Sequence, residues 1–146
     1  MKILVVSGPN LNMLGKRDPT KYGIITLEEI NQNLALLSKK LNIELVFFQS
    51  NIEGEIINFL QTDDSRSADG MILNPGALIR YAYCFRQAIV DWNKPFVELH
   101  MSDINKTGVN KKINILDDVD SRINQVVGLK EASYYSALEF IVNYLS

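Results

Sequence analysis

Short apolar runs alternate with longer segments of helical spacing along this chain. Five runs are apolar for most of their length, and we predict a strand in each of them: residues 2–6, 43–48, 70–73, 95–100 and 125–129. Apolar positions at helical spacing predict helices after Thr26 and over residues 53–61, 78–92 and 132–145. Nearly continuous apolar strands are typical of a parallel sheet that helices cover on both faces.

Two of the predicted helices carry further local signals. Thr26-Leu27-Glu28-Glu29 has the spacing of a capping box, and the helix after it places on one face Ile30, Leu34, Leu37 and Leu41. The segment 78–92 carries aromatic side chains on several sides. They include Tyr81, Tyr83 and Phe85, which belong either to the core or to a contact between subunits.

Strand–helix alternation with right-handed crossovers predicts an α/β fold. We expect a flavodoxin-like, doubly wound sheet of five parallel strands in the order 2-1-3-4-5. No repeat, low-complexity tract or break in composition divides the sequence, so we expect residues 1–146 to form a single domain. Ligands of such sheets bind beyond the carboxyl ends of the strands.

Charge, hydropathy and cysteine content give no support for several classes of partner or location. The formal net charge of −2 gives no electrostatic reason to expect nucleic acid or a membrane surface as a partner. No apolar run approaches the length of a membrane span, and the apolar start is too short for a signal peptide. Cys84 is the only cysteine, so no intrachain disulfide can form, which agrees with a cytoplasmic protein.

The most informative segment is the long polar loop from Gly8 to Gly23, directly after the first strand. A loop of this length in a compact domain is usually a lid, a binding loop or a linker, and its composition is not that of a flexible spacer. A phosphate-binding P-loop is disfavoured, because six residues rather than four separate Gly8 from Gly15-Lys16, and Arg17 follows.

Polar side chains follow the predicted strands, and the topology gathers them at one rim of the sheet: Asn10, Asn74, Glu98, His100, Ser102 and the loop with Arg17 and Tyr22. This set suits acid–base chemistry on a polar, anionic small molecule. One histidine cannot build a typical zinc site, and no Cys/His cluster has metal spacing, so we expect no metal.

Glu98 and His100 lie two residues apart on a predicted strand, so their side chains point to the same side. A carboxylate beside an imidazole can fix its tautomer and make it a better acid near neutrality. A purely structural Glu–His hydrogen bond at a strand end explains these two residues about equally well.

The other candidates leave similar alternatives open. A guanidinium such as Arg17 stabilises a nearby phenolate, and an opposite charge within a few ångströms lowers a pKa by about one to three units; Tyr22 is otherwise an incidental residue of a solvated loop. Asn74-Pro75-Gly76-Ala77 is either a turn into a helix or an anion site made of an amide and backbone N–H groups. Met101-Ser102 leaves the same choice.

Taken together, these segments resemble the type II 3-dehydroquinate dehydratase (type II dehydroquinase) family. The opening signature of the family is matched by Gly8-Pro9-Asn10-Leu11-Asn12-Met13-Leu14-Gly15 with Arg17-Asp18-Pro19 and Tyr22-Gly23. Later matches are Gln49-Ser50-Asn51-Ile52-Glu53-Gly54, Asn74-Pro75-Gly76-Ala77, Val97-Glu98-Leu99-His100-Met101-Ser102 and, more loosely, Val127-Gly128-Leu129. The matches follow in order over nearly the whole chain, and the first is highly specific.

The resemblance implies reversible dehydration of 3-dehydroquinate to 3-dehydroshikimate, a shikimate-pathway step in aromatic amino acid biosynthesis, without metal or organic cofactor. It also implies a homododecamer built from trimers. Tyr22 would be the base, kept ionised by Arg17, and Asn10 would hold the water or enolate oxygen. His100, oriented by Glu98, would be the acid. The substrate and its carboxylate would be bound by Asn74, Gly76, Met101 and Ser102.

The chain departs from the family pattern around the substrate hydroxyls. Arg80 replaces a substrate-binding histidine of a Thr-His-Thr-Ser stretch, and Gln87 replaces an aspartate that reaches a neighbouring subunit's site. Beyond Ser102, a histidine and two arginines of the family are replaced by Asn105, Thr107 and Lys111. Lys111 keeps the charge but loses the bidentate fork of arginine. We expect Arg80, Gln87 and Lys111 to line an altered substrate pocket, with Arg80 offered to the substrate.

Two hypotheses follow. In the first, the protein is an active dehydroquinase with an altered pocket, which the retained Tyr22 and His100 favour because a binding module needs no acid and base. In the second, it is a dehydroquinase-like protein that binds another small anion or serves as a non-catalytic assembly subunit. A nucleotide- or flavin-binding module of the same fold is a distant third.

Overall fold

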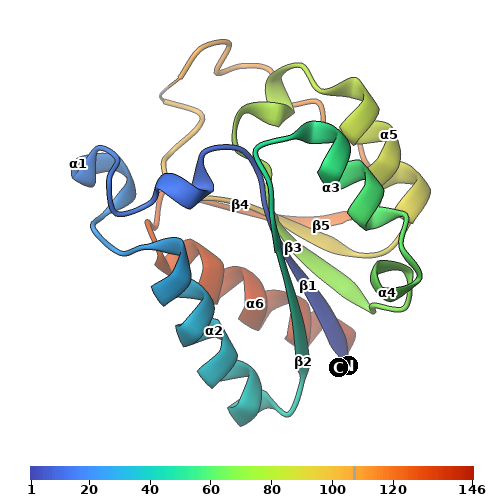
Figure 1. The fold of residues 1–146 in the computed structure, drawn as a ribbon. Helices are drawn as coiled ribbons and strands as arrows, with labels where there is room; N and C mark the ends of the chain where they lie inside the picture. The colour runs from blue at the N-terminus through green and yellow to red at the C-terminus, as the bar shows by residue number, and fades with distance from the viewer. Residues whose placement is uncertain (107) are drawn as a thin grey trace.

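Five parallel strands form one sheet in the order β2-β1-β3-β4-β5 in a computed structural model, which describes residues 1–106 and 108–146 (Figure 1). Thr107, one of the altered pocket positions, lies outside the described residues. The strand order and the parallel direction are those predicted from the sequence, so the predicted α/β fold is confirmed.

The register of the strands places their carboxyl ends side by side. The strands are β1 (Lys2–Ser7), β2 (Glu44–Gln49), β3 (Gly70–Asn74), β4 (Phe96–His100) and β5 (Arg122–Val127). Ser7 pairs with Asn74 across β1 and β3, and Leu73 pairs with Glu98 across β3 and β4. Every residue of β3 and β4 is buried, as expected for central strands of a sheet covered on both faces.

Helices cover both faces of the sheet. α2 (Leu27–Leu41) and α6 (Ala132–Leu145) lie on one face, and α3 (Glu53–Leu60) and α5 (Tyr83–Trp92) lie on the other, with the short α4 (Asp63–Arg66) after α3 (Figure 1). Because side chains alternate along a strand, Ile3 and Val5 of β1 pack toward α2 and α6, while Leu4 and Val6 pack toward α3 and α5.

The predicted capping box begins α2. Thr26 Oγ1 accepts a hydrogen bond from the Glu29 backbone N–H at 3.2 Å, and the Glu29 carboxylate accepts one from the Thr26 backbone N–H at 2.8 Å. These two bonds pair N–H groups that have no partner within the helix. The sequence therefore fixes the start of α2 locally.

The predicted helix over residues 78–92 is wrong in one respect, because it is broken. A 3₁₀ helix, η2 (Gly76–Arg80), precedes α5, and the two are separated at Tyr81 and Ala82. The Ile79 carbonyl, which a continuous helix would offer to the Tyr83 N–H, accepts a hydrogen bond from the Ile115 N–H at 2.9 Å instead. The contact with a distant segment therefore interrupts the helix.

The fifth strand begins earlier and ends sooner than the predicted range 125–129. β5 is an edge strand and pairs with β4. The register of this pair is irregular, because Phe96 lies opposite Arg122 and Val97 opposite Asn124. The first residues of β5 include polar side chains, so a prediction based on apolar runs missed the start of the strand. Gly128, with φ of 79°, ends it.

The loop after β1 contains two short helical turns, η1 (Leu11–Met13) and α1 (Pro19–Tyr22). Leu11 and Leu14 are buried in the core on the α2 side, which holds the first half of the loop down. Asp18 caps α1 by accepting from the Thr20 N–H at 2.9 Å. None of the four residues of α1 is fully buried.

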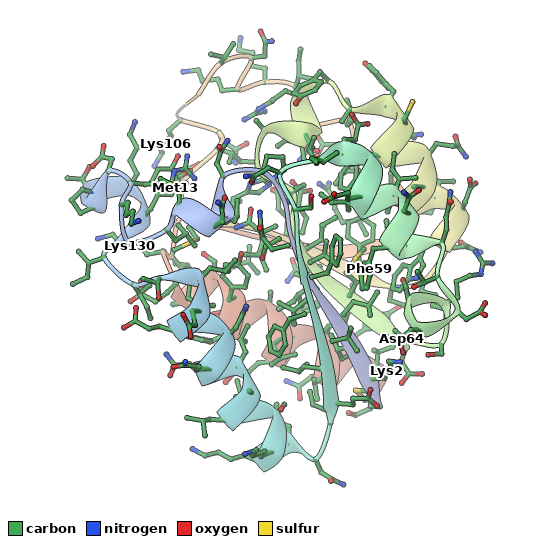
Figure 2. The ribbon with its side chains drawn as sticks, in the orientation of Figure 1. Lys2, Met13, Phe59, Asp64, Lys106 and Lys130 are labelled. Atoms are coloured by element: carbon green, nitrogen blue, oxygen red, sulfur yellow. The ribbon has the colours of Figure 1, made fainter. Side chains whose placement is uncertain are left out.

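The two ends of the sheet differ in their side chains. At the amino ends of the strands, Lys2 forms an ion pair with Asp64, and Figure 2 shows both far from Met13, Lys106 and Lys130 at the other end.

Phe59 of α3 stacks on Phe48 of β2, with ring centroids 4.3 Å apart. Among the helices of the described residues, none is long and apolar enough to cross a membrane.

We predict that Thr26→Ala destabilises the protein by about 1 kcal/mol, because the variant loses the side-chain acceptor of the capping box. Urea unfolding followed through Trp92, the only tryptophan and 4% exposed, would measure the change. Thr26→Ser keeps the hydroxyl and should unfold close to the wild type. An unchanged urea midpoint for Thr26→Ala would contradict the prediction.

Candidate active site

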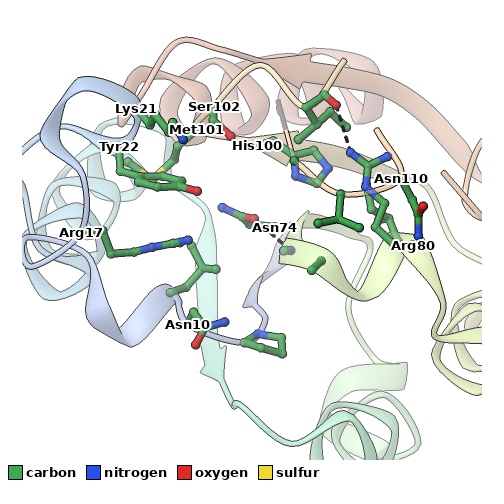
Figure 3. Close-up of a pocket in the computed structure, with 18 of the residues that line it drawn as sticks. Asn10, Arg17, Lys21, Tyr22, Asn74, Arg80, His100, Met101, Ser102 and Asn110 are labelled. Atoms are coloured by element: carbon green, nitrogen blue, oxygen red, sulfur yellow. Dashed lines mark hydrogen bonds between the residues drawn. The ribbon is translucent and has the colours of Figure 1, made fainter. Parts of the chain in front are cut away.

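A cavity of about 450 Å³ opens at the carboxyl ends of β1, β3 and β4 (Figure 3). Its wall includes most of the candidate residues: Asn10, Arg17, Tyr22, Asn74, Gly76, Arg80, His100, Met101 and Ser102. Figure 3 shows Arg17 and Tyr22 on one side of the cavity, His100 and Arg80 on the other, and Asn74 between them. A volume of this size suits a small-molecule ligand.

Two backbone segments that contribute residues to the cavity wall, after β1 and after β3, approach each other closely. A Cβ on Gly8 would lie 2.8 Å from the Pro75 carbonyl oxygen, and one on Gly76 would lie 3.1 Å from the Pro9 carbonyl oxygen. Gly76 also has a positive φ of 57°. Glycine at these two positions therefore lets the segments after β1 and β3 meet.

Asn10 and Asn74 present amide groups to the cavity from these two segments. Asn10 adopts the left-handed conformation, with φ of 69°, and its backbone N–H donates to Asn51 Oδ1 at 2.9 Å. Asn74 Nδ2 donates to the Tyr134 hydroxyl at 3.2 Å, while Asn74 Oδ1 accepts from the Gly76 N–H at 3.3 Å. The Asn74 amide is therefore fixed at both ends.

Tyr134 of α6 is a support that the sequence pattern did not reveal. Its side chain is fully buried, and its hydroxyl also contacts Ser7 Oγ at 2.8 Å. Burial raises the pKa of Tyr134 to about 12, against the smaller opposite effect of its hydrogen bonds to Ser7 and Asn74. The phenol thus stays protonated and ties Asn74 to the end of β1.

His100 and Glu98 form the contact that their spacing predicted. His100 Nε2 lies 2.7 Å from Glu98 Oε1, and the two residues are 4% and 0% exposed. An ionised carboxylate can only accept hydrogen bonds, so Nε2 carries the proton of this bond. That leaves Nδ1 as the ring nitrogen that can exchange a proton with a ligand.

Glu98 stays ionised although it is buried. Burial raises the pKa of the Glu98 carboxyl, but contacts with His100 and Arg122 outweigh this effect and bring the pKa below its ordinary value. Arg122 Nη1 donates to Glu98 Oε2 at 2.6 Å, and Asn114 Nδ2 donates to Glu98 Oε1 at 2.7 Å. Neither Arg122 nor Asn114 was among the candidates, since no local motif links them to Glu98.

Arg17 and Tyr22 meet as expected, but through the face of the ring. The guanidinium carbon of Arg17 lies 3.8 Å from the centroid of the Tyr22 ring. A guanidinium over an aromatic face is held by the ring quadrupole as well as by van der Waals contact. The pair lies on the cavity side of the loop, together with Lys21, which the sequence analysis did not select.

Arg80 lines the cavity, but its guanidinium has partners in the protein. It donates to the backbone carbonyls of Ile104 and Ile113, the former at 3.0 Å. Arg80 therefore ties the segment after β4 to η2. The predicted offer of Arg80 to the substrate stays a prediction, and the observed contacts give this side chain a structural role in the cavity wall.

Three altered positions lie away from the cavity of this chain. Gln87 is exposed on α5 and donates to Asp91 at 2.8 Å. Lys111 and Asn105 are exposed on the segment between β4 and β5 and do not line the cavity. Their part in substrate binding stays a prediction, and for Gln87 the resemblance places it at a neighbouring subunit.

The described part of the chain contains no cluster of candidate metal ligands. No group of three or more His, Cys, Asp or Glu side chains there could hold a metal ion. What the cavity does assemble is an imidazole, a phenol, guanidinium groups and amides. Such groups bind anions and move protons.

Comparisons with known proteins agree with this geometry. Residues 1–142 match the family described as dehydroquinase class II. The chain is 40% identical over 142 residues to a 3-dehydroquinate dehydratase of Halothermothrix orenii, covering 97% of this chain and 94% of that protein. It is 41% identical over 138 residues to a 3-dehydroquinate dehydratase of Pelotomaculum thermopropionicum, covering 94% of each.

A solved structure extends the similarity to the backbone. The type II dehydroquinase from Butyrivibrio crossotus superimposes with a TM-score of 0.89 at 35% identity, covering 98% of this chain and 97% of that one. The resemblance seen in the sequence motifs is thereby confirmed over the length of the fold. The chain belongs to the type II, or class II, dehydroquinase family.

Proposed function

We propose that this protein catalyses the reversible dehydration of 3-dehydroquinate to 3-dehydroshikimate, a step of the shikimate pathway. The relatives at about 40% identity carry the name of this activity. The observation that carries the proposal is one cavity that holds both a His100–Glu98 pair and a Tyr22–Arg17 pair. An acid and a base on opposite sides of a small cavity suit the elimination of water.

Tyr22 acts as the base. As a phenolate it takes the proton alpha to the ketone of 3-dehydroquinate, and the electron pair moves onto the ketone oxygen to form an enolate. The guanidinium of Arg17 over the ring stabilises the negative charge on Tyr22 before this step. The carboxylate of the substrate makes closure of the loop over an anion favourable beside Arg17 and Lys21.

The enolate then expels the hydroxyl group. Asn10 holds the water or the enolate oxygen, since developing oxyanions are stabilised by fixed hydrogen-bond donors. His100 donates a proton from Nδ1 to the departing hydroxyl, which leaves as water, and the enolate collapses to the conjugated enone. Tyr22 then returns its proton to solvent, and His100 takes one up, so that no metal or organic cofactor is required.

The remaining groups hold the substrate. We assign the carboxylate and ring hydroxyls of the substrate to the polar side of the cavity, which is lined by Asn74, Gly76, Met101 and Ser102. Arg80 completes the wall on the η2 side. Lys111 and Gln87 are exposed in this chain and do not line the cavity, so we keep their contact with the substrate as a prediction.

The alternative is a dehydroquinase-like protein that binds another small anion or serves as a non-catalytic subunit of an assembly. The engagement of Arg80 with two backbone carbonyls favours it, because that guanidinium is then less available to a substrate than the family's histidine. The intact acid and base favour the enzyme, since a binding site has no use for a buried, ionised partner behind its histidine.

We further propose a homododecamer built from trimers. Tyr81, 62% exposed, lies between η2 and α5 and lines the cavity, and Tyr83, 68% exposed, begins α5, whereas Phe85 is in the core. Large exposed apolar side chains of this kind are common at subunit interfaces. A cytoplasmic location stays a prediction from the sequence.

The first test is turnover of 3-dehydroquinate by the purified protein, followed through the ultraviolet absorbance of the conjugated enone. We expect robust turnover. Tyr22→Phe is the control, because it removes the phenolic hydroxyl but keeps the ring beneath Arg17. This variant should keep its fold and lose at least about a hundredfold in kcat. Retained turnover would reject Tyr22 as the base, and a folded, inactive wild type would support the alternative.

His100→Ala should separate the two proton transfers. We expect kcat for elimination to fall by about a hundred- to ten-thousand-fold, because the leaving hydroxyl loses its acid. Proton removal by Tyr22 should continue, so 3-dehydroquinate recovered from D₂O should carry deuterium alpha to the ketone. Full turnover by His100→Ala would remove His100 from the mechanism, and loss of exchange as well as turnover would point to a binding role.

Sedimentation velocity tests the assembly. We expect the wild type to sediment as a twelve-subunit particle and Tyr83→Glu to sediment as a smaller species, because a carboxylate would be buried without a partner in the interface. A monomeric wild type at micromolar concentration would overturn the proposed dodecamer.

A further inference from the structure

We propose that Arg122 is a positioning residue for His100, which it controls through Glu98. This inference deepens the proposed function and rests on it for its catalytic meaning. Arg122 lies outside the cavity, at the first residue of β5, and so acts only through other side chains. Its effect is to hold Glu98 as an ionised acceptor, which keeps the His100 proton on Nε2 and offers Nδ1 to the substrate.

The contacts around Glu98 form a chain with no gap. Both carboxylate oxygens are engaged: Oε2 by Arg122 Nη1 at 2.6 Å, and Oε1 by Asn114 Nδ2 and by His100 Nε2, both at 2.7 Å. The Glu98 side chain is 0% exposed, so water does not compete for these positions. Three donors and the absence of solvent hold the Glu98 carboxylate in one orientation. Its hydrogen bond to Nε2 in turn fixes the orientation of the His100 imidazole.

Arg122 is itself held in place from the opposite side. Its Nη2 lies 3.0 Å from Asp117 Oδ1 and donates to the Asp117 backbone carbonyl at 3.4 Å. The Arg122 side chain is only 16% exposed, while that of Asp117 is 62% exposed. Solvent therefore screens the charge of Asp117 far more than that of Arg122, and the buried charge next to Glu98 is the guanidinium.

The charge of Arg122 decides the proton count of the buried pair. With Arg122 present, the positive guanidinium balances the negative carboxylate of Glu98. A further proton on His100 then gives the buried cluster a net positive charge. Without Arg122, the same proton would neutralise a buried net negative charge. Arg122 therefore favours neutral imidazole with Nδ1 unprotonated, and it makes the protonated Nδ1 a readier donor to the leaving group.

Other ionisable groups lie around the cavity that His100 lines. The cavity wall brings Arg17, Lys21 and Tyr22 from the loop after β1 and Arg80 from η2, and α6 contributes Tyr134. Asp103, further along the segment after β4, lies 3.3 Å from Lys106. None of these contacts is altered by a substitution at Arg122, so they form a constant background for the comparison of variants.

Three variants isolate the effect. Arg122→Gln removes the charge, and Arg122→Lys retains it. Arg86→Gln is the matched control, because Arg86 binds the same segment through the Ile115 carbonyl at 2.9 Å and Asp118 at 3.0 Å. A loss that arises only from loosening residues 115–118 should appear in Arg86→Gln too, whereas a loss that arises from Glu98 should not.

The first readout needs no turnover, because His100 is the only histidine of the chain. Magic-angle-spinning ¹⁵N NMR of sedimented, ¹⁵N-histidine-labelled protein reports the protonation of Nδ1 and Nε2 whatever the size of the assembly. We expect Nε2 protonated and Nδ1 unprotonated at pH 8 in the wild type and in Arg86→Gln. In Arg122→Gln, Nδ1 should remain protonated to higher pH, whether the pair carries its extra proton on the imidazole or on Glu98.

The second readout is the pH profile of kcat with 3-dehydroquinate. We expect Arg122→Gln to lower kcat by about ten- to a hundredfold, within the limit set by losing the acid altogether, while KM changes little. The alkaline limb of its profile should move to higher pH. Arg122→Lys should return both the limb and most of kcat toward wild-type values, and Arg86→Gln should leave both unchanged.

The outcomes separate this inference from the proposed function. An inactive wild type with the expected NMR contrast would reject the proposed function and keep the link from Arg122 to His100. Equal Nδ1 titration in the wild type and Arg122→Gln, or an equal shift in Arg86→Gln, would overturn the inference. If Arg122→Gln does not fold, the wild type alone still decides, because a protonated Nδ1 at pH 8 contradicts it.

Discussion

The parallel hydrogen-bond ladder through β1, β3 and β4 is the constraint on which the site depends. It sets Ser7 beside Asn74 and brings the end of β4 alongside, so that groups far apart in the sequence share one rim. Side chains alternate along β4, which places Glu98 and His100 on the same side and within 2.7 Å. The loop after β1 then has only to reach across this rim to complete the cavity.

Burying the ionised carboxylate of Glu98 in the sheet carries a desolvation free energy, which three hydrogen-bond donors offset. A buried ion pair is seldom more stable than apolar residues of the same size, and removing one partner is strongly destabilising. Glu98 with Arg122 is therefore better understood as an orienting device than as a source of stability. What it gains is an imidazole with a fixed tautomer at the wall of the cavity.

The features predicted correctly from the sequence depend on local spacing or on general rules of α/β topology. The capping box at Thr26 and the Glu98–His100 contact follow from spacing over a few residues. The strand order follows from strand–helix alternation and the right-handed crossover rule. The break before α5 could not be predicted, because Ile115 takes the Ile79 carbonyl from outside the segment. Arg122 was not predicted as a site residue for the same reason, because its contact with Glu98 joins segments far apart in the sequence. Arg17 and Tyr22 were paired correctly, but their stacked geometry depends on the fold of the loop.

The two halves of the site rest on different amounts of packing. His100 is held by a buried strand, by Glu98 behind it, and by Ser133, whose hydroxyl donates to the His100 carbonyl at 3.0 Å. Tyr22 belongs to a four-residue helix with no fully buried side chain, capped by exposed hydrogen bonds. Segments with so few buried contacts open at low free energy. The proposed base therefore lies on the part of the site that can admit a substrate, and the proposed acid on the part that cannot move without disturbing the sheet.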